Sequence, residues 1–305
     1  MAVTVTQLVA FLTVFRRGSV TAAAEELVVT QPSVSAAIGA LERELGVTLM
    51  ERSGRGLRPT AAGKLYAPYA SDVLGLLDQG ARAAREAGGD RRRTLRIGAV
   101  TTAGEHLVAP LLRTFREGHG DLEITLHVGN REDVFRRLLA RELDVAITGR
   151  FPEDEAFDGR PFAPNEIVLI ATPGDPLARA RSVGVRELAG RAWLMREPGS
   201  GTRTLCEEWL AANELKPRTL TLGSNGAIKS AVGLGLGIAL QPRCAVQLEL
   251  ELGMLATIRP RGGLPRRAWY VVRSAVGPVR EEVTSFMEFA VSRAAQHALA
   301  RALAP

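Results

Sequence analysis

The run from Ser19 to Leu45, SVTAAAEELVVTQPSVSAAIGALEREL, predicts two amphipathic helices joined by a tight turn. Apolar residues recur at helical spacing in both halves of the run: Val20, Ala23, Ala24 and Leu27, then Val34, Ile38, Leu41 and Leu45. Thr30 is suited to cap the second helix, because its hydroxyl can accept a hydrogen bond from a free backbone N–H. Pro32 fits a first helical turn, where a missing N–H costs little. This pattern is typical of a helix-turn-helix, whose second helix enters the major groove of DNA.

The flanks of this run favour a DNA-binding module over the alternative, an ordinary helical hairpin, which has similar spacing. Residues 8–15 predict a third amphipathic helix that can close a small core. Residues 47–59 predict two short apolar strands around a Gly/Arg turn, a β-hairpin or wing. Arg52, Arg55 and Arg58 lie on this hairpin, and arginines in such a place suit phosphates and the minor groove. A solvated surface loop is the alternative for the hairpin.

The candidate DNA-contacting residues lie in the first turns of the second helix and on the wing: Thr30, Gln31, Pro32, Ser33, Ser35, Arg52, Arg55 and Arg58. Gln31 can form two hydrogen bonds with adenine, at N6 and N7. Residues 1–60 carry six basic and five acidic side chains. The DNA hypothesis therefore depends on the motif and on local arginines rather than on bulk charge.

The N-terminal third resembles the LysR-type transcriptional regulators. The matching residues are AAEELVVTQPSVS (Ala23 to Ser35), Leu41–Glu42, Leu49, Arg52 and PTAAG (Pro59 to Gly63), and the length and order of the remaining chain also fit. The resemblance implies an α/β protein overall. Its expected parts are a winged helix-turn-helix over residues 1–59, a linker and dimerisation helix over 60–90, and an effector-binding domain like a periplasmic binding protein over 91–305.

That effector domain is expected to have two lobes, lobe I at about 91–163 and 267–305 and lobe II at about 164–266. Three C-terminal strings, Val128–Glu132, Ala146–Arg150 and Arg196–Arg203, resemble regulators of Calvin-cycle operons within the family. The sequence also departs from the family pattern: Ala36, Ala37 and Gly39 stand where longer polar residues are common, and Met50 replaces a wing phenylalanine. These departures bear on the strength and site preference of DNA binding and not on the fold.

A heptad pattern predicts a long helix from Thr60 to about Gly88. The predicted seam comprises Ala62, Tyr66, Tyr69, Val73, Leu76, Gly80, Ala83 and Ala87, and Leu65 and Leu77 widen it. A core helix is the alternative, but the length of this helix and its place between two domains favour a dimerising linker. Pro68 should kink it or loosen one turn.

Beyond residue 93 the pattern changes to alternating strands and helices, which predicts a parallel sheet covered by helices. The predicted elements are strand Thr94–Val100, helix Gly104–Glu117, strand Leu122–Val128, helix Asn130–Arg141 and strand Asp144–Thr148, then strands Ile167–Ala171 and Ala192–Met195, helix Thr202–Asn213, strand Thr219–Leu222, helix Ala227–Gly233, strands Ile238–Gln241 and Ala268–Arg273, and a terminal helix Val279–Ala304.

Ligands of open α/β sheets bind beyond the carboxyl ends of the strands. Two loops there, Thr101–Gly104 and Gly199–Thr202, combine hydroxyls with the start of a helix, where backbone N–H groups favour an anion. Simple helix capping is the alternative for each loop. The candidate effector-binding residues are Thr101, Thr102, Asn130, Gly149, Arg150, Ser200, Gly201, Thr202 and Asn225. Together they predict a small anionic metabolite as the effector.

The composition limits the classes of protein to which the chain can belong. The chain has 305 residues, 46% of them hydrophobic, and a net charge of +6, so it can form two or three globular domains. Cys206 and Cys244 lack redox or metal spacing, and no apolar run approaches the roughly 18 residues of a membrane span. We therefore expect a cytoplasmic protein with no metal, no cofactor and no catalytic constellation.

The expected partners are promoter double-stranded DNA, a small-molecule effector and further copies of the chain, as a homodimer through the linker helix or a homotetramer. The competing interpretation is an α/β small-molecule-binding protein or enzyme whose N-terminal helices are a protein-interaction module. Binding to the DNA upstream of the gene separates the two interpretations.

Overall fold

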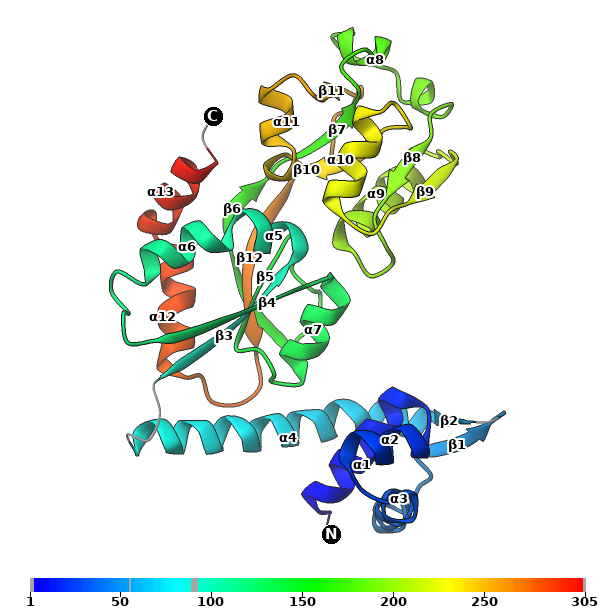
Figure 1. Ribbon diagram of the computed structural model, residues 1–305, viewed down its shortest axis with the longest axis vertical. Coiled ribbons are helices and arrows are strands. Elements are labelled where there is room, and N and C mark those ends of the chain that lie inside the picture. Colours follow the sequence, from blue (N-terminus) through cyan, green and yellow to red (C-terminus); the bar gives the residue numbers. More distant parts are fainter. Residues whose placement is uncertain (1–2, 55, 89–92, 304–305) are drawn as a thin grey trace. The chain divides into compact units, whose positions relative to one another are not determined.

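The computed structural model describes residues 3–54, 56–88 and 93–303. The chain divides into two compact units, one of residues 1–91 with 139–142 and one of residues 92–138 with 143–305 (Figure 1). The first unit is helical with one small hairpin, and the second is α/β.

Three short helices form the core of the first unit. They are α1 (Val5–Arg17), α2 (Val20–Leu27) and α3 (Gln31–Leu45). Each begins after a Ser or Thr residue whose side chain accepts a hydrogen bond from a backbone N–H of the first turn. These capping residues are Thr4, Ser19 and Thr30. Their buried side chains, which include Phe11, Val14, Ala23, Val34, Ile38 and Leu41, pack into one cluster. The helix-turn-helix, the third helix and the Thr30 cap are thus confirmed.

The wing follows directly. Strands β1 (Met50–Ser53) and β2 (Gly56–Pro59) pair antiparallel, with Met50 opposite Pro59. Helix α4 (Ala61–Ala87) then begins at the Thr60 cap and contains Pro68. Its Gly63 lies so close to the wing that a Cβ would stand 2.1 Å from the Leu49 carbonyl oxygen, so only glycine fits there.

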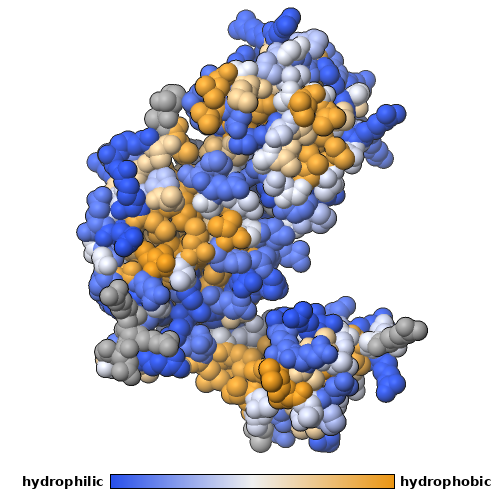
Figure 2. Space-filling view, in the orientation of Figure 1, coloured by the Kyte–Doolittle hydropathy of each residue, from blue (hydrophilic) through white to orange (hydrophobic). Residues whose placement is uncertain are grey.

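The long helix is confirmed, but the predicted seam is wrong at Tyr66. The Tyr66 ring packs against Phe11, with centroids 5.7 Å apart, because the first turns of α4 also cover the core of this unit. Four large apolar side chains of the predicted seam and its widening remain exposed on α4 and form a stripe: Leu65, Tyr69, Val73 and Leu77. Figure 2 shows apolar side chains gathered on the visible face of this unit.

Lobe I of the second unit is built on a five-stranded sheet in the order β4-β3-β5-β12-β6. The strands are β3 (Thr94–Val100), β4 (Glu123–Gly129), β5 (Val145–Thr148), β6 (Phe157–Asn165) and β12 (Arg267–Ser274). Strands β3, β4 and β5 are parallel, whereas β12 runs antiparallel to β5 and β6. Helices α6 (Val108–Phe115), α12 (Glu281–Ala290) and α13 (Arg293–Ala302) share its main core, and α7 (Arg131–Leu139) lies on the other side in Figure 1.

Lobe II contains a three-stranded antiparallel sheet, β10-β7-β11, and a parallel pair, β8-β9. The strands are β7 (Ile167–Ala171), β8 (Trp193–Met195), β9 (Thr219–Thr221), β10 (Ala239–Pro242) and β11 (Ala256–Ile258). Its helices are α8 (Pro176–Arg179), α9 (Gly201–Ala212), α10 (Asn225–Gly233) and α11 (Gln247–Glu251). Trp193 is fully buried at the centre of one of its two apolar clusters.

Two predicted helices are each broken in two, and two strands, β6 and β11, were missed. The segment predicted as Gly104–Glu117 forms α5 (Thr101–His106) and α6, which meet at Leu107. The terminal segment breaks where Ser292 caps α13. Strand β6 escaped prediction because Pro161 and Pro164 interrupt its pattern, yet it pairs along β12 with an irregularity between Trp269 and Tyr270.

Candidate functional site

The first turn of α3 presents the predicted reading residues to solvent. Gln31, Pro32, Ser33 and Ser35 are all exposed, whereas Val34 between them is buried in the core. The Thr30 and Ser33 hydroxyls lie 2.8 Å apart and hydrogen-bond each other. Thr30 therefore fixes the start of the helix, and the remaining side chains are open to solvent at its N-terminal end.

The two described wing arginines differ in their surroundings. Arg58 Nε lies 2.9 Å from Glu51 Oε1 across the hairpin, because the register places these residues opposite each other. Arg52 is exposed on the same hairpin. Arg55 falls outside the described residues. Arg58 consequently has a competing carboxylate for any phosphate that it meets.

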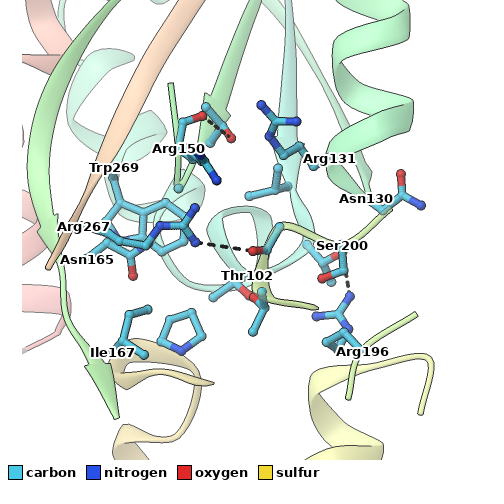
Figure 3. A pocket seen from close by; sticks show the side chains of 17 residues that line it. Thr102, Asn130, Arg131, Arg150, Asn165, Ile167, Arg196, Ser200, Arg267 and Trp269 are labelled. Carbon is cyan, nitrogen blue, oxygen red and sulfur yellow. Dashed lines mark hydrogen bonds between the residues drawn. The ribbon is translucent and has the colours of Figure 1, made fainter. Parts of the chain in front are cut away.

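A cavity lies between the two lobes of the second unit, at the carboxyl ends of β3, β4 and β5 (Figure 3). The residues that line it are Val100, Thr101, Thr102, Asn130, Arg131, Thr148, Gly149, Arg150, Asn165, Ile167, Arg196, Ser200, Gly201, Thr202, Pro242, Arg267 and Trp269. The structure thus brings together eight of the nine predicted effector-binding residues. The Asn130 Oδ1 atom also accepts a hydrogen bond from the Asp133 backbone N–H. This oxygen therefore caps a helix, as the alternative interpretation of such residues held.

Three arginines of lobe I converge on this cavity: Arg131, Arg150 and Arg267 (Figure 3). Burial lowers the pKa of Arg131 and of Arg267, and the positive charge of Arg150 lowers both further. Arg131 Nε is buried without a hydrogen-bond partner among the described residues. These guanidinium groups are thus partly desolvated and close to one another, an arrangement that an anion between them would relieve.

The start of α9 faces the same space from lobe II. Ser200 is the N-cap residue and is buried, yet its side chain makes no capping hydrogen bond. The preceding Gly199 has φ of 83°, which favours glycine, and it turns the chain into the helix. A helix start of this kind offers backbone N–H groups to an anion. The Arg267 Nη1 donates to the Gly201 carbonyl oxygen at 3.4 Å and links the two walls.

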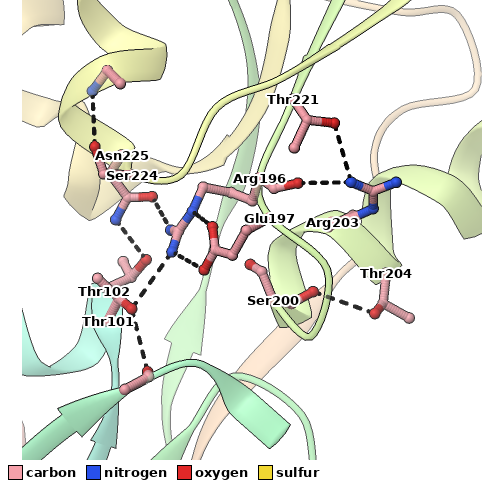
Figure 4. A network of polar contacts seen from close by, with 12 residues as sticks. Thr101, Thr102, Arg196, Glu197, Ser200, Arg203, Thr204, Thr221, Ser224 and Asn225 are labelled. Carbon is pink, nitrogen blue, oxygen red and sulfur yellow. Dashed lines mark hydrogen bonds and ion pairs between the residues drawn. The ribbon is translucent and has the colours of Figure 1, made fainter. Parts of the chain in front are cut away.

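Asn225, the ninth predicted residue, lies behind the lining in a polar network (Figure 4). Its amide oxygen accepts from Arg196 Nη1 at 2.5 Å, and its amide nitrogen donates to Thr102 Oγ1 and Glu105 Oε2, each at 3.0 Å. Arg196 is only 3% exposed and also pairs with Glu197. Asn225 therefore ties the two lobes together, and the amide that the prediction offered to a ligand is already engaged.

The polar lining residues that sequence reasoning missed include Arg131, Asn165, Arg196 and Arg267. Two of them had a usable signal, because Arg131 follows β4 by two residues and Arg196 directly follows β8, at strand ends. Asn165 and Arg267 had none, since they lie where the chain crosses between lobes. The Asn165 Oδ1 atom is buried and has no hydrogen-bond partner within the described ranges.

The cavity is narrow. The centres of water molecules reach about 40 Å³ of it, enough for a few waters or one small anionic group. A neighbouring cavity of about 260 Å³ by the same measure shares Arg131, Arg150, Gly201 and Arg267 with it. A ligand can therefore place one small group in the inner cavity and its remainder in the outer one.

Other chemistry finds little support in the described residues. Burial raises the pKa of the Cys206 and Cys244 thiols to about 12, so the reactive thiolate is scarce at neutral pH. Within residues 3–54, 56–88 and 93–303, no group of three His, Cys, Asp or Glu residues is placed to hold a metal ion. No helix in this part of the chain is long and apolar enough to cross a membrane.

A helix-turn-helix with a wing, joined to a two-lobed α/β domain with a polar cavity, defines a ligand-responsive DNA-binding regulator. Comparison with known families agrees. Residues 5–64 match the bacterial regulatory helix-turn-helix protein model of the lysR family, and residues 88–295 match the LysR substrate binding domain. The chain belongs to the LysR family of transcriptional regulators; it is a regulator and not an enzyme.

Similar proteins point to one branch of that family. The HTH-type transcriptional regulator CbbR of Rhodospirillum rubrum is 36% identical over 93% of this chain and 95% of its own length. The RuBisCO operon transcriptional regulator of Allochromatium vinosum is 33% identical over 97% of this chain and 98% of its own length. Among solved structures, the regulatory domain of Synechocystis CcmR in complex with 2-PG is 29% identical, with a TM-score of 0.62 over 66% of this chain and 96% of that one.

Proposed function

We propose that this regulator responds to a small metabolite that carries a phosphate or carboxylate group, bound in the cavity between the lobes. The observation that carries the proposal is the convergence of Arg131, Arg150 and Arg267 on the start of α9. Guanidinium groups and a helix N-terminus both favour an anion, and they face it from opposite walls. The buried Asn165 oxygen adds an acceptor for a ligand hydroxyl.

The chemical class follows from the size of the cavity and from the relatives. The inner cavity suits one small anionic group, and the outer one the rest of a short molecule. The Synechocystis relative was solved with 2-PG, 2-phosphoglycolate, which has a phosphate at one end and a carboxylate at the other. We propose a ligand of this kind, with Thr101, Thr102, Asn130, Gly149, Arg150, Ser200, Gly201 and Thr202 among its contacts and Asn225 holding the lobes around it.

We further propose promoter DNA as the target, read by Gln31, Pro32, Ser33 and Ser35, with Thr30 setting the helix start and Arg52, Arg55 and Arg58 facing phosphates. The relatives named for the RuBisCO operon favour genes of carbon dioxide fixation as the regulated set. The proposed organisation is residues 1–59 for DNA, 60–90 for dimerisation and 91–305 for the effector. The assembly would be a cytoplasmic homodimer through α4, or a homotetramer.

A thermal-shift screen of the full chain tests the effector proposal, with 2-phosphoglycolate, sugar phosphates, NADPH and simple dicarboxylates. A ligand at 100 times its Kd should stabilise the protein by about 2.7 kcal/mol. Calorimetry on Arg267→Met should then show weaker binding of the hit. If Arg267→Met and Thr202→Val both bind a tight ligand as well as the parent does, the effector site lies elsewhere.

A further inference from the structure

A carboxylate from lobe II already lies against the arginines of lobe I. Glu208 is on α9, and its Oε1 lies 2.5 Å from Arg150 Nη1. Arg150 follows β5, so this ion pair spans the two lobes at the edge of the cavity. Both side chains remain partly in solvent, Arg150 39% and Glu208 51% exposed, so the pair can open without leaving a buried charge alone.

The influence of Glu208 extends to the other two arginines. Its negative charge raises the pKa of both Arg131 and Arg267, against the lowering by burial. Arg150 has a second, weaker carboxylate neighbour in Glu153, 3.8 Å away and 90% exposed. The hydrogen bond that Arg150 donates to Glu208 is the main reason why the pKa of Arg150 is raised. Glu208 itself lines neither cavity, but it engages Arg150, which lines both, so an anion that binds Arg150 competes with this carboxylate.

We propose that Glu208 is a built-in competitor of the effector: without ligand its carboxylate occupies Arg150 and ties the two lobes, and the anionic group of the ligand displaces it. This inference rests on the proposed function, because it assumes that an anion binds in the cavity. It adds a residue that sets the affinity of the cavity for its ligand and the kind of anion that the cavity prefers.

The charge of the ligand decides the competition. A carboxylate that replaces Glu208 exchanges one single negative charge for another, so it gains little at Arg150. A phosphate monoester carries a charge of about −1.5 to −2 near neutral pH, by the same chemistry as a phosphorylated side chain, and offers three acceptor oxygens. It therefore brings roughly half a charge to one charge more than Glu208 does. It also reaches Arg131 and Arg267 at the same time. Glu208 thus favours phosphorylated ligands over ligands with a single carboxylate.

The neighbouring residue provides a matched control. Glu207 lies on the same helix, is also 51% exposed and also pairs with an arginine, Arg203, at 2.8 Å. That pair stays within α9 and does not line either part of the cavity. Glu207→Gln and Glu208→Gln thus remove the same charge from adjacent positions, and only the second removes an ion pair between the lobes.

The test uses the full-length protein and inorganic phosphate as the probe, measured by calorimetry. Glu208→Gln should bind phosphate severalfold more tightly than the parent, and Glu207→Gln should match the parent. Thr202→Val should weaken phosphate binding, which shows that the measured site is the cavity and not the DNA-binding unit. Without phosphate, Glu208→Gln should also speed amide hydrogen exchange at the start of α9, and Glu207→Gln should not.

The outcomes separate this inference from the proposed function. If phosphate binds the parent in the cavity but binds Glu208→Gln no more tightly, Glu208 is not a competitor. The anion site itself is then still supported. Phosphate that binds neither the parent nor Glu208→Gln at tens of millimolar overturns both. Equal gains in Glu207→Gln and Glu208→Gln would show a general charge effect and would also overturn the competitor.

Discussion

The DNA-binding unit and the effector cavity are built in opposite ways. The reading helix, its cap and the wing come from one continuous stretch, residues 30–59, and each functional side chain is placed by its own helix or hairpin. The cavity draws its lining from segments between Val100 and Trp269, in two lobes that the chain crosses between twice. A locally built site can be altered one residue at a time, whereas an assembled cavity couples each residue to the position of a whole lobe.

The largest expected effect concerns α4, which is needed if two reading helices are to act together. Val73→Asp with Leu77→Asp places two carboxylates on its exposed apolar stripe. Burying each in a dimer interface should cost at least about 1–3 kcal/mol, so the dissociation constant of the dimer should rise roughly 100-fold or more. Analytical ultracentrifugation measures it. Ser71→Asp, away from the stripe, is the control, and a double variant that stays dimeric would rule out the stripe as the interface.

The next largest effect tests whether a residue of the reading helix can be changed without altering the effector cavity. Gln31→Ala should weaken binding to the operator by about 1–3 kcal/mol, because Gln31 is exposed in the first turn of α3 and can read adenine. Binding to unrelated DNA and to the effector should not change. Fluorescence anisotropy with specific and scrambled DNA gives both affinities. An unaltered ratio of the two would show that Gln31 does not contact bases.

The reciprocal test removes one hydroxyl from the cavity. Thr202→Val keeps the shape at the start of α9 and should weaken effector binding by about 1 kcal/mol, with DNA affinity in the absence of ligand unchanged. Thr221→Val is the control, because Thr221 bonds Arg203 and does not line the cavity. If Thr202→Val alters DNA binding without ligand, the two sites are less separate than their construction suggests.

The smallest effect distinguishes the two wing arginines. Arg52→Ala should reduce the salt slope of log K for DNA by about one, so the loss of affinity between 50 and 200 mM salt should be about fourfold smaller than in the parent. Arg58→Ala should reduce it less, since Glu51 already pairs with Arg58. Titrations of both variants against salt decide the matter. Equal slopes for the two would mean that the Glu51 pair opens on DNA.

The family resemblance and the helical spacing sufficed for the DNA-binding unit. Thr30 as a cap, Pro32 in the first helical turn and the hairpin at residues 50–59 all follow from local rules, because hydrogen bonds within a few residues set them. What local rules missed was Tyr66. Its spacing fitted a dimer seam, but Phe11, far away in sequence, takes its ring into the core.

The sequence by itself determined the class of protein, most elements of both lobes and the two loops that start α5 and α9, because periodicity and helix-start chemistry are local. Only the tertiary structure placed Arg131 and Arg267 beside Arg150, withdrew Asn225 into a network with Arg196, and set Glu208 against the lobe I arginines. The physical reason is that ion pairs and desolvation depend on distances between residues far apart in the chain, which no local pattern records.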